Sequence, residues 1–207
     1  RGMTTRHIAH CAAPVFVPST NLPSLFLMPI AVVIDLTGIS MAAGRLVSVA
    51  FALAGVVAVF LLVRLMLGPF MGLVAAFVVA VMRWDIIWSR IGMHGITAPL
   101  FAALSAWLLL RALKSGRTSD FGFAGAALGL GMWFYASFRL FPLVLGFILV
   151  HHVVSQRPRL RRLILQVIIL AAVSLMVAAP VVQSAVVDSD EFFDRTDDTS
   201  VFSIMSF

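Results

Sequence analysis

Long uncharged apolar runs alternate with short polar segments along most of this chain. A helix rises ~1.5 Å per residue and the hydrocarbon layer is ~30 Å thick, so about 20 residues suffice to cross it. The runs are continuous rather than alternating, which favours helices over a membrane barrel. The pattern predicts an all-α polytopic membrane protein with about six transmembrane helices, at 46–63, 69–86, 96–113, 121–138, 140–156 and 163–183.

The apolar segment that precedes these spans is too short to be a typical span. It covers 22–34, contains Pro23 and Pro29, and runs into Asp35. We predict a short interfacial helix over 22–36, within an outer segment 1–44. A tilted full span is the alternative, and it would move residues 1–21 to the other side of the membrane.

The composition agrees with an apolar solvent. Hydrophobic residues make up 61% of the chain and charged residues 12%, whereas a soluble domain has about half and about a quarter. The mean hydropathy is +1.06. The chain begins at Arg1 rather than Met and ends at Phe207 within an apolar stretch, so we expect one membrane domain over 1–207 that is a fragment of a longer protein. Cys11 is the single cysteine, which excludes an internal disulfide.

The positive charges predict the topology. One basic cluster holds Arg111, Lys114 and Arg117, and the other is RPRLRR at 157–162. Cytoplasmic loops of membrane proteins carry an excess of Lys and Arg, so both clusters are placed inside. Arg64 then also falls inside, and the outer connections are 1–44, 84–95, 136–139 and 184–207. This arrangement explains the net charge of +6 without a nucleic-acid partner, and it predicts a multi-pass protein of the plasma membrane.

Three arginines fall at the outer ends of different predicted spans: Arg45, Arg90 and Arg139. Cations on the outer side run against the positive-inside tendency, so we interpret them as a rim that binds a phosphate. His94 and Tyr135 are candidates for the same substrate site. The alternative is that Arg90 and Asp85 are solvated loop charges, that Arg139 reaches the lipid headgroups, and that Tyr135 is an interfacial aromatic residue.

Metal and cofactor signals are weak. The outer tail EFFDRTDDTSVF at 191–202 carries four carboxylates that could act as a base or bind a divalent cation, but a solvated loop has the same composition. His7 and His10 lack a nearby carboxylate. We predict no cofactor and no metal site, although a divalent metal stays open.

Several ordered motifs resemble those of the protein O-mannosyltransferase-like superfamily, bacterial and archaeal membrane glycosyltransferases with the GT-C fold (glycosyltransferase family 39 type). The chain is similar to that family over most of residues 14–207. The motifs are NLPSLF (21–26), GISMAAGRLVS (38–48), WSRIGMHGITAPLF (88–101), GAALGLGMWFYASFRLFPL (125–143) and EFFDRTDDTSVF (191–202).

The resemblance implies a transferase that takes a sugar from a polyprenyl-phosphate donor on the outer face of the bilayer. The family's acidic pair in the first outer loop implies a catalytic carboxylate upstream of Arg1, because no Asp or Glu precedes Asp35. The family's Lys-Pro-Pro is reduced here to Asn21-Leu22-Pro23. Developing negative charge on the leaving phosphate would be stabilised by Arg90, Arg139 and Arg45. The sequence does not identify the sugar or the acceptor.

Two other functions are compatible with the same sequence pattern. A secondary transporter or flippase would use the outer arginines to receive an anionic substrate, but such proteins favour ionisable residues at mid-membrane depth. A non-catalytic membrane scaffold would need no carboxylate before Arg1.

Overall fold

A computed structural model describes residues 16–17, 22–38, 41–92, 94–134, 138, 140–156 and 160–187. Within these residues the chain is almost entirely helical, which confirms the predicted all-α class. The strands β1 (Phe16–Val17) and β2 (Leu22–Pro23) form only a two-residue antiparallel pair. The helical elements are η2 (Ser24–Phe26), α2 (Leu27–Thr37), α3 (Met41–Leu67), α4 (Pro69–Val81), α5 (Arg83–Ile91), η3 (His94–Ile96), α6 (Thr97–Ser115), α7 (Thr118–Phe134), α8 (Phe141–Gln156) and α9 (Leu160–Val187).

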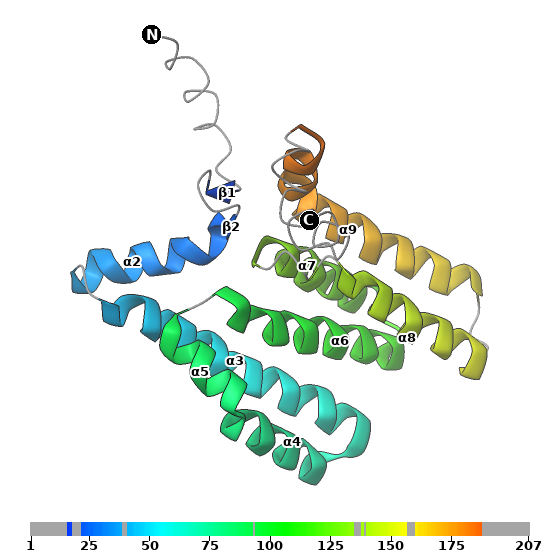
Figure 1. The fold of residues 1–207 in the computed structure, drawn as a ribbon. Coiled ribbons are helices and arrows are strands. Elements are labelled where there is room, and N and C mark those ends of the chain that lie inside the picture. The colour runs from blue at the N-terminus through cyan, green and yellow to red at the C-terminus, as the bar shows by residue number, and fades with distance from the viewer. Residues whose placement is uncertain are drawn as a thin grey trace, which may run out of the picture.

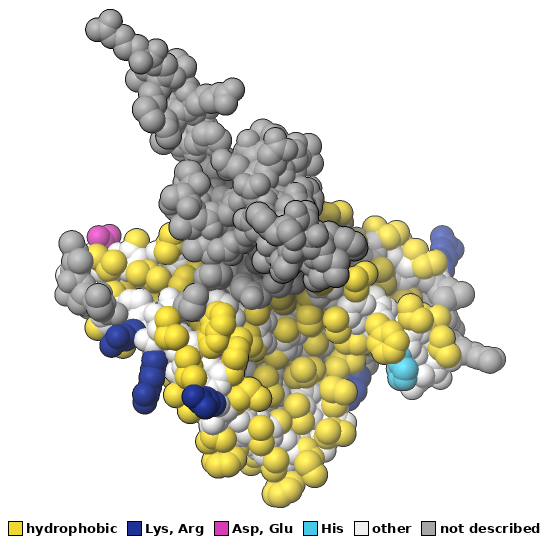
Figure 2. Space-filling view, in the orientation of Figure 1, with side chains coloured by type: hydrophobic (Ala, Val, Ile, Leu, Met, Phe, Trp, Pro, Cys, Tyr) yellow, Lys and Arg dark blue, Asp and Glu magenta, His cyan; other side chains and the backbone are white. Residues whose placement is uncertain are grey.

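The long helices lie side by side in a bundle (Figure 1). In the order of packing, α3 contacts α6, α6 contacts α7, and α7 contacts α9, while α4 returns along α3. In the described residues three helices are long and apolar enough to cross a membrane, within α3, α6 and α9, or four if the bent pair α4–α5 is one span. Apolar side chains cover much of the visible surface (Figure 2). The fold is that of a helical membrane protein.

A turn at Gly68-Pro69 joins α3 to α4. Gly68 has φ +93°, a conformation that suits glycine, and Pro69 occupies the first turn of α4. Gly72 then lets α4 approach α3 closely, because a methyl group there would lie 3.1 Å from the carbonyl oxygen of Phe60. The hairpin is therefore tight at this end of the bundle.

The predicted span 69–86 is interrupted by a bend, and the predicted outer connection 84–95 contains a helix. The apolar helix α4 stops at Val81, Met82 is extended, and α5 begins at Arg83 with a bend of 52°. The apolar residues Trp84, Ile87 and Ile91 share one side of α5 and are exposed, whereas Asp85 is buried. Residues 83–91 thus form a short helix of their own.

Glycine contacts fix the position of α7 against α9. A methyl group at Gly125 would collide with the carbonyl oxygen of Leu170, and one at Gly129 would lie 2.8 Å from the carbonyl oxygen of Ser174. Glycines four residues apart allow two membrane helices to approach at backbone distance. This pair explains why α7 and α9 pack so closely.

Hydrogen bonds bring the basic segments to one end of the bundle. The ammonium of Lys114 donates to the carbonyl oxygen of Leu65 at 2.6 Å, which joins the end of α6 to the end of α3. Arg162 and Gln166 of α9 both donate to the carbonyl oxygen of Gly116, at 3.0 and 2.9 Å. The ends of α3 and α6 and the start of α9 therefore meet, and we call this part of the molecule the basic end.

The helix α2 lies at the opposite end, beside the start of α3 (Figure 1). It has 11 residues, about 16 Å at the rise of an α-helix, and is too short to cross the hydrocarbon layer alone. Val32 and Leu36 are largely exposed and apolar, while Asp35 is exposed near its end. The predicted helix 22–36 is thus α-helical only from Leu27, and its place at the membrane surface stays a prediction.

Candidate functional site

The end of α5 packs directly on the start of α3. Gly92 has φ +79° and ends α5, and its amide donates to the carbonyl oxygen of Trp88 at 3.2 Å. A methyl group at Gly92 would lie 3.5 Å from the carbonyl carbon of Gly44 and 3.8 Å from the amide nitrogen of Arg45. These are ordinary van der Waals distances, so the end of α5 lies against the backbone at the start of α3. This contact lies at the end of the bundle opposite the basic end.

The contact places two of the three predicted arginines in the same neighbourhood. Arg45 begins the second turn of α3, Arg90 lies two residues before Gly92, and both side chains are exposed. Basic side chains gather over the region of α3 and α5, beside apolar surface (Figure 2). Exposed guanidinium groups at the edge of an apolar surface can bind the phosphate of a lipid-linked molecule.

The remaining predicted residues are only partly placed. His94 begins η3, in the short connection between α5 and α6, and the direction of its side chain lies outside the description. Arg139 and Tyr135 lie outside the described residues. Their predicted roles therefore stay predictions.

A cluster of aromatic side chains connects the helices near the end of the bundle that holds Arg45 and Arg90. The ring of Phe51 in α3 lies 5.9 Å from that of Phe26 and 5.4 Å from that of Phe134. Phe134 also stacks on Phe101 of α6 at 4.9 Å. Aromatic contacts of this kind tie η2, α3, α6 and α7 together. The end of α7, one residue before Tyr135 in sequence, is thereby held beside α3 and α6.

One acidic residue of this region, Asp85, lies in an environment that differs from the expected one. We weighed Asp85 as a solvated loop charge, but it lies in the first turn of α5 and is only 9% exposed. Asp85, Trp88 and Gly92 are spaced as one helix face, and that face packs inward: Gly92 meets α3 and Trp88 covers Gly95. Within the described residues its carboxylate has neither an ion pair nor a hydrogen bond. The i, i+3, i+7 spacing was the sequence signal for this burial.

Metal binding has no support in the described residues, which contain no group of three His, Cys, Asp or Glu side chains able to hold an ion. The carboxylates of the tail 191–202 lie outside the description. The described part of the candidate site consists of Arg45 on α3 and of Arg90 and the buried Asp85 on α5.

The bundle of apolar helices with polar residues at its ends defines a multi-spanning membrane protein. The sequence model of the dolichyl-phosphate-mannose-protein mannosyltransferases matches residues 22–183, most of the chain. The chain belongs to this family, and the resemblance noted from the sequence is confirmed. It is a membrane glycosyltransferase of the GT-C type. No curated protein and no solved structure matches the chain.

Proposed function

We propose that this chain is part of a membrane glycosyltransferase that moves a sugar from a polyprenyl-phosphate donor to an acceptor on the extracytoplasmic face. The observation that carries the proposal is the contact of Gly92 with Gly44, which brings the segments of Arg45 and Arg90 together. Family membership supplies the reaction class, and the arginines supply the binding chemistry for a phosphate.

The sidedness rests on the charges. Lys114 and Arg162 lie at the basic end, tied to Leu65 and Gly116. Cationic loops favour the cytoplasmic side, so the opposite end, with Arg45 and Arg90, is assigned to the extracytoplasmic face. A lipid-linked donor in the outer leaflet would present its phosphate at the depth of these helix ends.

The reaction breaks the bond between the anomeric carbon of the sugar and the phosphate oxygen. The sugar gains oxocarbenium character, and the departing polyprenyl phosphate gains negative charge. Guanidinium groups already in place stabilise that charge more than they stabilise the bound donor. Arg90 and Arg45, with Arg139, are assigned this role, and His94 and Tyr135 are assigned to the sugar side of the site.

The acceptor must lose a proton as the new glycosidic bond forms. The resemblance assigns this step to a carboxylate upstream of Arg1. Asp85 belongs to the same end of the bundle, but its burial argues against direct access to an acceptor in this conformation. The role of base therefore stays with the upstream carboxylate.

Binding of the leaving group tests this site without knowledge of the sugar or acceptor. Purified protein is titrated with a short polyprenyl phosphate, with the uncharged polyprenol as the comparison. A charge-assisted hydrogen bond contributes about 1.5–3 kcal/mol, so Arg90→Ala should weaken binding of the phosphate by at least about tenfold. Arg90→Lys should retain part of the affinity, and Arg83→Ala, at the far end of the same helix, should retain all of it.

Equal affinity of the Arg90→Ala variant and the native protein would remove Arg90 from the donor site. Equal affinity for polyprenol and polyprenyl phosphate would show that no phosphate is recognised. Proteoliposomes that take up an anionic substrate without any sugar transfer would favour the transporter instead.

A further inference from the structure

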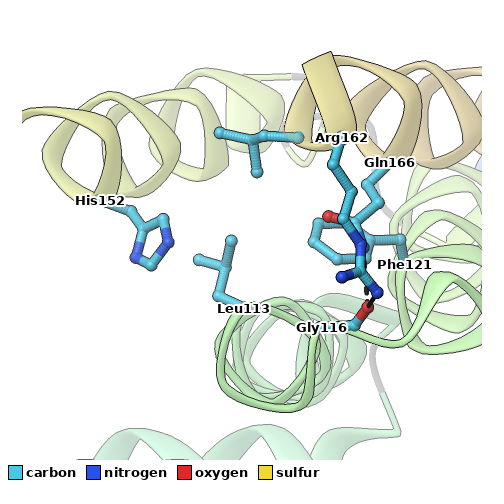
Figure 3. Close-up of a pocket in the computed structure, with 7 residues that line it drawn as sticks. Leu113, Gly116, Phe121, His152, Arg162 and Gln166 are labelled. Atoms are coloured by element: carbon cyan, nitrogen blue, oxygen red, sulfur yellow. Dashed lines mark hydrogen bonds between the residues drawn. The ribbon is translucent and has the colours of Figure 1, made fainter. Parts of the chain in front are cut away.

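Two adjoining clefts open at the basic end, the first lined by residues of α6, α7, α8 and α9 and the second by residues of α6 and α8. One has a volume of about 320 Å³ and the other about 450 Å³, and Leu113 and His152 line both. Figure 3 shows the first cleft, with His152 on one wall and Arg162 and Gln166 on the facing wall. Lys114 and His151 line the second cleft. Neither cleft belongs to the Arg45–Arg90 site at the other end of the bundle.

The polar groups of the clefts are cationic or neutral donors. Arg162 uses one terminal nitrogen for the carbonyl oxygen of Gly116 at 3.0 Å, which leaves other N–H groups of its planar fork for a ligand. The side-chain amide of Gln166 donates to the same carbonyl oxygen at 2.9 Å and so helps to fix the turn between α6 and α7. His151 and His152 have no hydrogen bond within the described chain, so their ring nitrogens are available.

No carboxylate among the described residues lines either cleft. Among the described acidic residues, Asp120 is the nearest in sequence to the residues that line the clefts. Its carboxylate accepts a hydrogen bond from Ser115 at 2.7 Å and lies 3.9 Å from the Nε of Arg111. Its charge is therefore already engaged. The clefts offer positive potential without an internal counter-ion, which suits an anionic ligand.

The apolar residues in and beside the clefts indicate what kind of anion would fit. Leu110, Leu113 and Ile148 form apolar wall below the polar groups. Beside the clefts, Val150 and Val154 of α8 and Ile164 and Leu165 of α9 expose apolar side chains, as expected of a lipid-facing surface. An anionic group with apolar chains that continue along the helices fits these surroundings.

We propose that these clefts bind the phosphate of an anionic phospholipid from the leaflet at the basic end. Arg162 and His152 contact the phosphate, while acyl chains lie against α8 and α9. Basic pockets between membrane helices on the cytoplasmic side bind anionic headgroups in this way. The lipid would bridge α8 and α9, whose cytoplasmic ends flank the clefts.

Native mass spectrometry of the purified protein tests the proposal. The probes are phosphatidylglycerol and phosphatidylcholine of equal chain length, with glycerol phosphate as the headgroup without chains. We expect retained phosphatidylglycerol, little phosphatidylcholine, and no displacement by glycerol phosphate. Displacement by equimolar glycerol phosphate would mean a free-anion site, and equal retention of both lipids would mean a surface without charge recognition; either overturns the proposal.

Adjacent arginines supply a matched pair of variants. Arg162→Gln removes the charge in the cleft but keeps an amide donor for Gly116, whereas Arg161→Gln removes an exposed charge that lines neither cleft. Arg162→Gln should weaken phosphatidylglycerol binding at least about tenfold, as expected for loss of one charge-assisted hydrogen bond. Arg161→Gln should change it less than twofold. Equal effects would reduce the interaction to general surface charge and overturn the site.

His152→Ala tests the same site by a second change, which is needed if Arg162→Gln disturbs the fold. Its ring makes no hydrogen bond within the described chain, so its removal leaves the packing of α6 and α9 intact. Weaker retention of phosphatidylglycerol with an unchanged melting temperature supports the site. Unchanged retention overturns it.

Discussion

The indole nitrogen of Trp133 donates a hydrogen bond of 2.7 Å to the carbonyl oxygen of Val177. Val177 lies three residues before Pro180, whose missing N–H leaves the carbonyl oxygen of Met176 without its helical donor. Membrane helices tolerate such prolines when neighbouring groups satisfy the disturbed backbone. Trp133 therefore joins α7 to α9 beside the break in the hydrogen-bond ladder.

Trp133→Phe should lower the stability of the protein while it keeps most of the aromatic volume. Loss of a hydrogen bond to a partly buried carbonyl costs about 1–2 kcal/mol, which corresponds to a melting temperature lower by a few degrees. The measurement is thermal unfolding in detergent followed by circular dichroism. Trp84→Phe is the control, since Trp84 is 41% exposed and no hydrogen bond is described for its indole. Equal losses in both variants would show that the bond to Val177 contributes nothing specific.

Gly125→Ala should separate α7 from α9. The added methyl group would collide with the backbone carbonyl of Leu170, which cannot rotate away as a side chain could. Overpacking of this kind costs about 1–3 kcal/mol. We expect a clearly lower melting temperature in the same unfolding assay.

Gly122→Ala is the matched control for this change, because a methyl group at Gly122 in the same helix meets nothing within 4 Å. Alanine also has the better helix propensity, so its melting temperature should stay equal or rise. If both variants melted alike, the close contact of α7 with α9 would have no energetic importance.

Gly92→Val should reduce binding of polyprenyl phosphate. A Cβ atom at position 92 would already touch the Gly44 carbonyl carbon at 3.5 Å, so the two further methyl groups of valine should push α5, and Arg90 with it, away from α3. Valine is also strained at φ +79°. The affinity should fall at least about tenfold, as for loss of one charged hydrogen bond.

Gly38→Val separates these two effects. Gly38 has φ +83° and nothing within 4 Å, so the variant has the same backbone strain without a displaced helix. Its melting temperature should fall as in Gly92→Val, but its affinity for polyprenyl phosphate should stay near that of the native protein. A parallel loss of affinity in both variants would refute the importance of the α3–α5 contact.

Asp85→Asn should stabilise the protein. A buried carboxylate without an ion pair or hydrogen bond in the described chain costs more than a neutral amide of the same shape. Relief of about 1–2 kcal/mol would raise the melting temperature by about 2–8 °C. Asp35→Asn, at an exposed position on α2, should leave it unchanged. A lower melting temperature for Asp85→Asn would reveal a compensating partner of the charge.

The apolar runs of the sequence already specified a helical membrane protein, because each run is long enough to satisfy its own backbone within lipid. The turn at Gly68-Pro69 and the basic segments around Lys114 and Arg162 were also predictable, since they depend on local backbone chemistry and on charge. The ordered motifs pointed to the family that residues 22–183 match. All of these properties belong to short segments.

The arrangement of those segments required the folded chain. The bend after Val81 separates the helix α5 from α4, and the contact of Gly92 with Gly44 brings Arg45 and Arg90 to one neighbourhood. Burial of Asp85 follows from the face that α5 packs on α3. The clefts beside His152 exist because α6, α8 and α9 meet there. Such contacts join residues far apart in the chain, so their geometry depends on how whole helices pack rather than on any local pattern.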